Sequence, residues 1–171
     1  MTAKIKKFPG VYLKESDFRE GKVLFNEWNP HAQYAWDAGV AIGRYLTELK
    51  EGRLVGVHCK QCHRTVIPPR TLCEWCFRPM DDWVFLPDTG TVNTFSLCYV
   101  TWDMKYLTDP EIPAVIDIDG TKPAGGIMHM LGEVDPGDVE IGMKVQAVWK
   151  PASDREGSIL DIKYFKPIKS K

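Results

Sequence analysis

Two C-x-x-C pairs, separated by ten residues, constrain this chain more than any other feature of its sequence. Each pair can place two thiolates on one turn of backbone, and two such turns facing each other form a tetrahedral sulfur site suited to zinc. Iron is the alternative metal, since tetrahedral sulfur sites also hold iron. Four protein ligands leave no open position for water or substrate, so the site is predicted to be structural. The predicted ligands are Cys59, Cys62, Cys73 and Cys76.

Composition places the chain among globular proteins and narrows its partners. Hydrophobic residues make up 44% and charged residues 26% of the 171 residues, enough to build one ordinary domain or a module beside a small domain. A net charge of -1 argues against binding nucleic acid mainly by phosphate neutralisation. No secretory h-region follows the basic N-terminus, and no apolar run approaches the roughly 20 residues of a membrane span. We therefore expect a cytoplasmic protein without a membrane partner, where reducing conditions favour metal ligation over disulfides.

The first predicted part, residues 1–52, is an arm followed by a helix. Residues 1–35 mix aromatics, Pro and Gly without a sustained period, so they are predicted to form an irregular arm with a short helical turn near 16–27. Such an arm cannot bury its aromatics alone, and we expect it to lie across a surface of its own domain or of a partner. From Trp36 to Leu49 apolar residues recur at three- and four-residue steps, which predicts an amphipathic helix of about fourteen residues.

Residues 53–83 hold the cysteines and are predicted to form a metal ribbon, with strands at 54–58 and 64–67 around the first pair. About thirty residues cannot fold by burial alone, whereas a structural zinc site supplies on the order of 10 to 16 kcal/mol. Residues 84–171 read as strands separated by turn signals, which suits a small closed Greek-key barrel of the OB type. The strands predicted for the barrel, including one that leads into it from the ribbon, are 83–86, 90–102, 112–119, 124–133, 143–150 and 158–166.

No catalytic constellation is visible among the remaining reactive residues. Cys98 lies in a segment that reads as a buried strand, without a base or helix N-terminus to activate its thiol. His58 and His63 flank the first cysteine pair, but four thiols at better spacing make them neighbours rather than ligands. His129, between two methionines on a predicted strand, is expected to have a packing or surface role. The pattern therefore favours a binding or scaffolding module over an enzyme.

Two classes of binding module join a metal ribbon to an OB barrel. A single-stranded nucleic-acid binder needs basic residues interleaved with aromatics, but between 84 and 148 the only basic residues are Lys105, Lys122 and Lys144. A module for a small anionic ligand or an enzyme partner fits better, because positive charge gathers in the helix and ribbon. An electron carrier is a third possibility if the metal is iron. The cations of the helix and ribbon are Arg44, Lys50, Arg53, Lys60, Arg64, Arg70 and Arg78.

Several segments together give the chain a family resemblance. The helix and its exit, the two cysteine pairs and the Pro68-Pro69-Arg70 run between them resemble rubredoxin-like zinc ribbon plus OB-fold proteins encoded beside thiolases. The likeness covers about residues 36–150. The matching segments outside the cysteine pairs are 36–39, 46–56, 68–70, 90–92, 113–115 and 141–145.

What this resemblance implies is a mainly β protein with an N-terminal helix, a rubredoxin-like zinc ribbon and a C-terminal OB barrel. Members look like non-catalytic partners of thiolases and related acyl-CoA condensing enzymes. The chain would then dock on a thiolase-type subunit through its helix and ribbon, in a complex that cleaves a 3-oxoacyl-CoA, with benzoylsuccinyl-CoA of anaerobic toluene degradation as the preferred case. Arg44, Lys60 and Arg70 are its candidate contacts to CoA or the partner. The family usually has Gly after each C-x-x-C, whereas His63 and Phe77 stand here.

Overall fold

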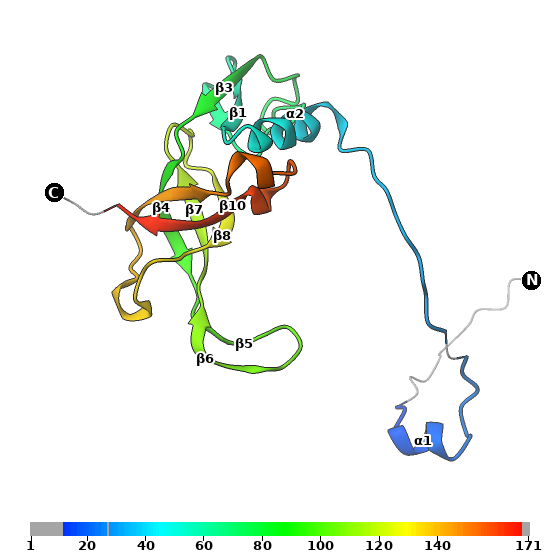
Figure 1. Cartoon of the computed structure of the whole chain (residues 1–171). Coiled ribbons are helices and arrows are strands. Elements are labelled where there is room, and N and C mark those ends of the chain that lie inside the picture. The colour runs from blue at the N-terminus through cyan, green and yellow to red at the C-terminus, as the bar shows by residue number, and fades with distance from the viewer. Residues whose placement is uncertain (1–11, 27, 169–171) are drawn as a thin grey trace, which may run out of the picture. The chain divides into compact units, whose positions relative to one another are not determined.

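The computed structural model describes residues 12–26 and 28–168. The chain divides into two compact units, one up to Trp36 and one from Asp37 onward (Figure 1). The first unit contains one short helix, α1 (Glu15–Arg19), at the start of the predicted helical turn near 16–27. Phe18 and Phe25 pack edge to face with ring centroids 5.5 Å apart, and no described side chain between 12 and 36 is buried. The part of the predicted arm before residue 12 lies outside the described residues.

The second unit begins with helix α2 (Gly39–Lys50), which starts three residues later than predicted. The reason is local: the Asp37 carboxylate accepts a hydrogen bond from the Gly39 N–H at 2.9 Å, and Gly39 has a φ of +68°, outside the helical range. Helix α2 buries Ala41, Tyr45 and Leu49 against the rest of the unit. The described residues of this unit leave its opposite side uncovered.

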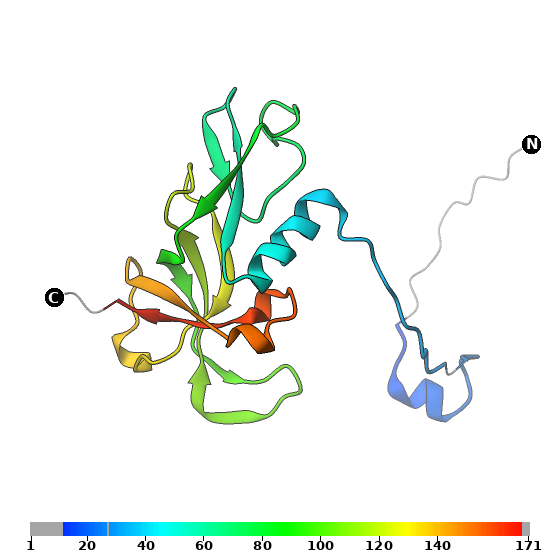
Figure 2. The same ribbon diagram turned by 45° about the horizontal axis from the view of Figure 1, so that its top comes forward.

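A three-stranded antiparallel sheet follows, with strand order β2-β1-β3. Its strands are β1 (Leu54–Cys59), β2 (Arg64–Val66) and β3 (Asp82–Leu86). The strands predicted at 54–58 and 64–67 are thus confirmed. Strand β3 pairs with β1 along its whole length and then leads directly into the barrel, so the two parts are joined without a linker (Figure 2).

Five strands form the barrel, in the order β10-β9-β4-β7-β8. They are β4 (Thr89–Phe95), β7 (Pro113–Ile118), β8 (Gly126–Met130), β9 (Lys144–Trp149) and β10 (Ile162–Pro167). The barrel closes where Leu131 pairs with Phe165 and the Gly132 N–H donates to the Phe165 carbonyl at 2.9 Å. Alternate residues of β7 are buried, as the period of a strand packed on one face requires. Three single-turn 3-10 helices, η1 (Pro136–Asp138), η2 (Ala152–Asp154) and η3 (Ile159–Asp161), lie in its loops.

The single strand predicted over 90–102 is wrong. Strand β4 ends at Phe95, and β5 (Cys98–Val100) leaves the barrel to pair with β6 (Tyr106–Glu111) in a separate hairpin (Figure 1). Strand β6 was not predicted, because Asp109-Pro110 within it is an unfavourable strand sequence. The predicted burial of Cys98 is wrong for the same reason: the thiol belongs to the hairpin and is only half-buried.

A four-cysteine metal centre and its surroundings

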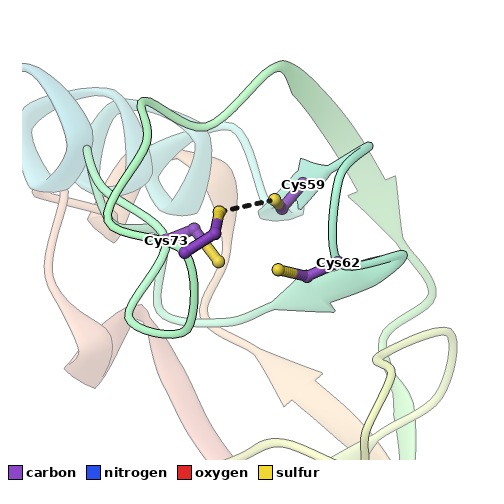
Figure 3. Close-up of side chains that lie close together, drawn as sticks. Cys59, Cys62 and Cys73 are labelled. Atoms are coloured by element: carbon purple, nitrogen blue, oxygen red, sulfur yellow. Dashed lines mark hydrogen bonds between the residues drawn. The ribbon is translucent and has the colours of Figure 1, made fainter.

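The four predicted ligands come together from two knuckles of the ribbon. Cys59 ends β1 and Cys62 lies in the turn before β2, while Cys73 and Cys76 lie in the loop between β2 and β3. All four sulfur atoms lie within 4.8 Å of one another, and those of Cys59 and Cys76 are 3.7 Å apart. Figure 3 shows Cys59, Cys62 and Cys73 directed toward a common centre.

These distances fit a tetrahedral metal ion. Zinc–sulfur bonds of about 2.3 Å in a tetrahedron place neighbouring sulfurs about 3.8 Å apart, close to the separation of the Cys59 and Cys76 thiols. The ribbon therefore supplies a complete set of thiolate ligands for zinc. Neither His58 nor His63 belongs to the group of possible metal ligands that the described residues form at this centre. His58 instead exchanges a hydrogen bond with Thr65 at 2.9 Å, as expected for a neighbour of the site.

The surroundings of Cys73 and Cys62 shift the pKa values of these two thiols in opposite directions. Backbone N–H groups of Cys76, and then Trp75, stabilise the thiolate of Cys73 and lower its pKa to about 6. Burial, followed by the neighbouring thiols, raises the pKa of Cys62 to about 12. The Cys62 thiol therefore keeps its proton at neutral pH unless a cation stabilises the charged form, which is what a bound zinc ion supplies.

The residue after each cysteine pair has a left-handed backbone conformation. The φ angles are 52° at His63 and 57° at Phe77, a region that favours glycine. The Phe77 N–H donates to the Cys73 carbonyl at 2.8 Å, which closes the second knuckle. The two departures from the usual glycines are thus accommodated with the knuckle geometry intact, at a cost in backbone strain.

A charged network links the two knuckles. Arg64, only 6% exposed, donates to Glu74 at 2.7 Å, and its guanidinium lies 4.0 Å from the ring centroid of Trp75. Glu74 also pairs with Arg70. Sequence reasoning missed Glu74, because residues 70–74 form a loop and the i,i+4 spacing predicts an ion pair only on a helix.

A hollow of about 180 Å³ lies between α2 and the ribbon, and one of the three candidate contacts of the sequence analysis lines it. Arg70 lines it directly; Arg44 stacks 4.4 Å from the centroid of Trp83, and Lys60 pairs at 2.9 Å with Asp82, both of which line the hollow. Arg44 and Arg70 also have carboxylate partners, Glu48 and Glu74. The lining residues are Val40, Ala41, Val57, Arg70, Thr71, Met80, Asp81, Asp82 and Trp83.

Other groups considered in the sequence have structural partners. His129 is buried, with Nε2 3.2 Å from the Ile159 carbonyl and Nδ1 accepting from the Met130 N–H. Lys105 lies on the hairpin and pairs with Asp103, whereas Lys144 lies on β9 and pairs with Asp119. Together with Lys122 they are too few to line a groove for phosphates. Within residues 12–26 and 28–168 no helix has the length and apolar character needed to cross a membrane.

Fold and site together define a zinc-ribbon and OB-barrel protein whose metal centre is closed to substrate. The family model described as the rubredoxin-like zinc ribbon domain of ChsH2 matches residues 47–81, and that of the ChsH2 C-terminal OB-fold domain matches residues 83–150. A DUF35 domain-containing scaffold protein of Methanocaldococcus jannaschii is 31% identical over 121 residues, which span 68% of this chain and 83% of that protein. The chain belongs to the DUF35 family, and the fold and family predicted from its sequence are confirmed.

Two solved structures share the fold. A DUF35 protein of unknown function from Sulfolobus solfataricus has a TM-score of 0.60 at 22% identity, covering 76% of this chain and 87% of that one. A chain of the Ltp2-ChsH2(DUF35) aldolase has a TM-score of 0.55 at 20% identity, covering 81% and 98%. At these identities the likeness concerns the fold.

Proposed function

We propose that this chain is a non-catalytic, cytoplasmic scaffold subunit that docks on a thiolase-type catalytic chain and completes its acyl-CoA site. The observation that carries the proposal is the open side of α2 beside the hollow. A methyl group added at Gly39 or Gly43 would meet nothing within 4 Å, and Val40 on the same side is 78% exposed. This side of the helix therefore leaves room for the backbone of another protein to approach closely.

The cations around the hollow suit the anionic part of a CoA ester. Arg44, Lys60 and Arg70 each have a carboxylate partner but remain at the surface, where an ion pair contributes little and can be exchanged. A phosphate arriving at Arg70 would replace Glu74, and guanidinium groups bind phosphate in a bidentate manner. The metal ribbon would hold these groups in place, while the partner supplies the cysteine and histidine of the thiolysis.

The substrate class we infer is a 3-oxoacyl-CoA cleaved with free CoA, with a bulky aromatic acyl group such as benzoylsuccinyl as the preferred case. Two observations support this inference. The chain resembles accessory proteins of thiolases, and its arm carries exposed aromatic side chains at Trp28, Tyr34 and Trp36. Buried in a complex, such side chains contribute much of the binding free energy at protein interfaces.

Co-expression with the thiolase-type chain of the same organism tests the role. The two chains should elute together, and the catalytic chain alone should have lost most of its thiolytic activity. Arg70→Ala should raise KM for the CoA ester with the complex intact, whereas Lys163→Ala, an exposed lysine on β10, should change neither. Separate elution with full activity of the catalytic chain alone contradicts the proposal.

A further inference from the structure

The hairpin of residues 98–111 presents apolar side chains that the other described residues of the second unit do not cover. None of its side chains is buried, although an isolated two-stranded hairpin is marginally stable in water. In both views the hairpin projects from the barrel at the end away from the ribbon (Figures 1 and 2). Its large exposed apolar residues are Tyr99, Val100, Trp102, Met104 and Tyr106.

The turn of the hairpin satisfies its polar groups internally. The Thr101 hydroxyl donates to Asp103 at 2.5 Å and accepts from the Lys105 N–H at 3.0 Å, and the Thr101 N–H donates to the Lys105 carbonyl at 2.9 Å. Lys105 also pairs with Asp103 at 2.6 Å. These contacts fix the shape of the turn, so the side chains on it are presented in a defined arrangement.

The two apolar residues of this turn, Trp102 and Met104, gain no burial in the described structure that would offset their exposure to water. Trp102 is 96% and Met104 77% exposed, and Met104 has a φ of +65°. A left-handed backbone is strained for a residue with a side chain. Strain at a surface position that buries nothing is expected where the side chain is used in binding.

A second apolar feature lies at the base of the hairpin. Where the hairpin leaves the barrel, a shallow hollow of about 230 Å³ is lined largely by apolar groups, including Phe95, Pro113 and Met128. This hollow is separate from the one beside α2. Large exposed apolar side chains gathered at one end of a unit mark an interaction site.

Charge on the hairpin identifies the kind of partner. Lys105 is its only cation and is paired, whereas Asp109 and Glu111 are exposed and have no ion pair among the described residues. The resulting negative charge disfavours an anionic membrane, and a second copy would bring like charge to the same place. A protein surface with an apolar pocket and a basic rim complements both features.

We propose that the hairpin inserts Trp102 and Met104 into an apolar, basic-rimmed pocket of the catalytic partner, as a second docking surface distinct from α2 and the ribbon. The inference rests on the proposed role of the chain as a scaffold subunit. Because the two surfaces lie at different ends of the unit, variants at one should leave the other intact.

The test measures affinity between the purified full-length chain and its thiolase-type partner by titration calorimetry. Trp102→Ser combined with Met104→Gln should weaken binding at least tenfold. Zinc content and thermal unfolding should be unchanged, because neither side chain is packed and residue 104 keeps a side chain of similar length on the same left-handed backbone. Ile141→Ser, at an exposed apolar residue before β9, is the matched control and should bind like the unmodified chain.

Each alternative result is decisive. If the unmodified chain binds the partner and the double variant binds equally well, the hairpin inference is wrong while the scaffold role stands. If the unmodified chain does not bind, both fail. Concentration-dependent dimerisation of the chain that the double variant abolishes, measured by sedimentation, would assign the surface to a second copy instead. Binding of the unmodified chain to phosphatidylcholine–phosphatidylglycerol vesicles would assign it to lipid.

Discussion

Arg64 and Glu74 join the two knuckles of the metal ribbon through a hydrogen bond of 2.7 Å between a guanidinium and a carboxylate. Arg64 is buried and belongs to β2, whereas Glu74 lies between the two cysteines of the second knuckle. The bond therefore connects the strand that follows the first pair of ligands to the turn that carries the second pair.

Glu74→Ala should destabilise the zinc-loaded ribbon, because it leaves the Arg64 guanidinium buried without its carboxylate. Hydrogen bonds to charged groups contribute about 1.5 to 3 kcal/mol, and the partial exposure of Glu74 places the expected loss near the lower end. Thermal unfolding of the zinc-bound protein measures it. Glu140→Ala, at an exposed acid with no side-chain partner among the described residues, is the control. Equal stability of the two variants would contradict the linking role of Glu74.

Serine substitutions should distinguish the four cysteines that bind the metal from Cys98, which does not. Cys73→Ser is expected to release zinc and unfold residues 54–86, since metal binding provides most of the free energy that folds so small a ribbon. Cys98→Ser should keep the metal, because the Cys98 thiol lies on the hairpin, outside the group of four ligands, with its sulfur 3.7 Å from the Ser96 hydroxyl. Elemental analysis and hydrogen exchange of the ribbon measure both. A Cys73→Ser protein that keeps one zinc and a protected ribbon is the result that rules the ligand out.

Phe77→Gly should stabilise the ribbon by up to about 1 kcal/mol. Its φ of 57° is costly for an aromatic residue, and its side chain, 79% exposed, gains little from burial. The same substitution at Phe85, an exposed position on β3, should instead destabilise, because glycine weakens a strand interior. Denaturant midpoints of the two zinc-bound variants provide the comparison, and a loss of stability in Phe77→Gly would show that the aromatic ring contributes to folding.

The metal ribbon was predictable from sequence because its determinants are local. Two cysteine pairs at fixed spacing specify both the knuckles and their convergence. In the barrel, alternate residues of β7 are buried, and this period of two is likewise a local property of the sequence. The start of α2 and the hairpin were not predictable in this way. The first depends on the hydrogen bond between Asp37 and Gly39, and the second on how the chain leaves the barrel after Phe95.

The contacts around the metal centre could be identified only from the three-dimensional structure. The sequence indicated positive charge in the helix and ribbon, but it could not show that Arg44 stacks on Trp83 or that Lys60 reaches Asp82, because each pair joins segments more than twenty residues apart. Cation positions could therefore be predicted, as could a pair between neighbours on a helix such as Arg44 and Glu48, whereas the distant partners Trp83 and Asp82 could not.

Asp161 should make the stability of the second unit sensitive to acid. Burial opposes the charged form of this carboxylate, but it accepts hydrogen bonds from the backbone N–H groups of Ser158, Glu156 and Gly157 at 2.7 to 3.0 Å, and these outweigh burial and lower its pKa. Because the folded-state pKa lies below the unfolded value of about 3.9, the stabilisation is complete above that value and is lost as pH falls through the folded-state pKa.

Asp161→Asn should therefore cost about 3 kcal/mol near neutral pH, since a neutral amide offers one accepting oxygen to three donors. The loop it releases also supports α2, because a methyl group at Gly157 would lie 3.1 Å from the Leu46 carbonyl. Urea unfolding between about pH 7 and pH 3 should show a constant difference between the two proteins that shrinks below about pH 4. Asp154→Asn, at an exposed carboxylate of η2, should have little effect throughout this range. A difference that persists unchanged into acid would mean that Asp161 acts by shape rather than by charge.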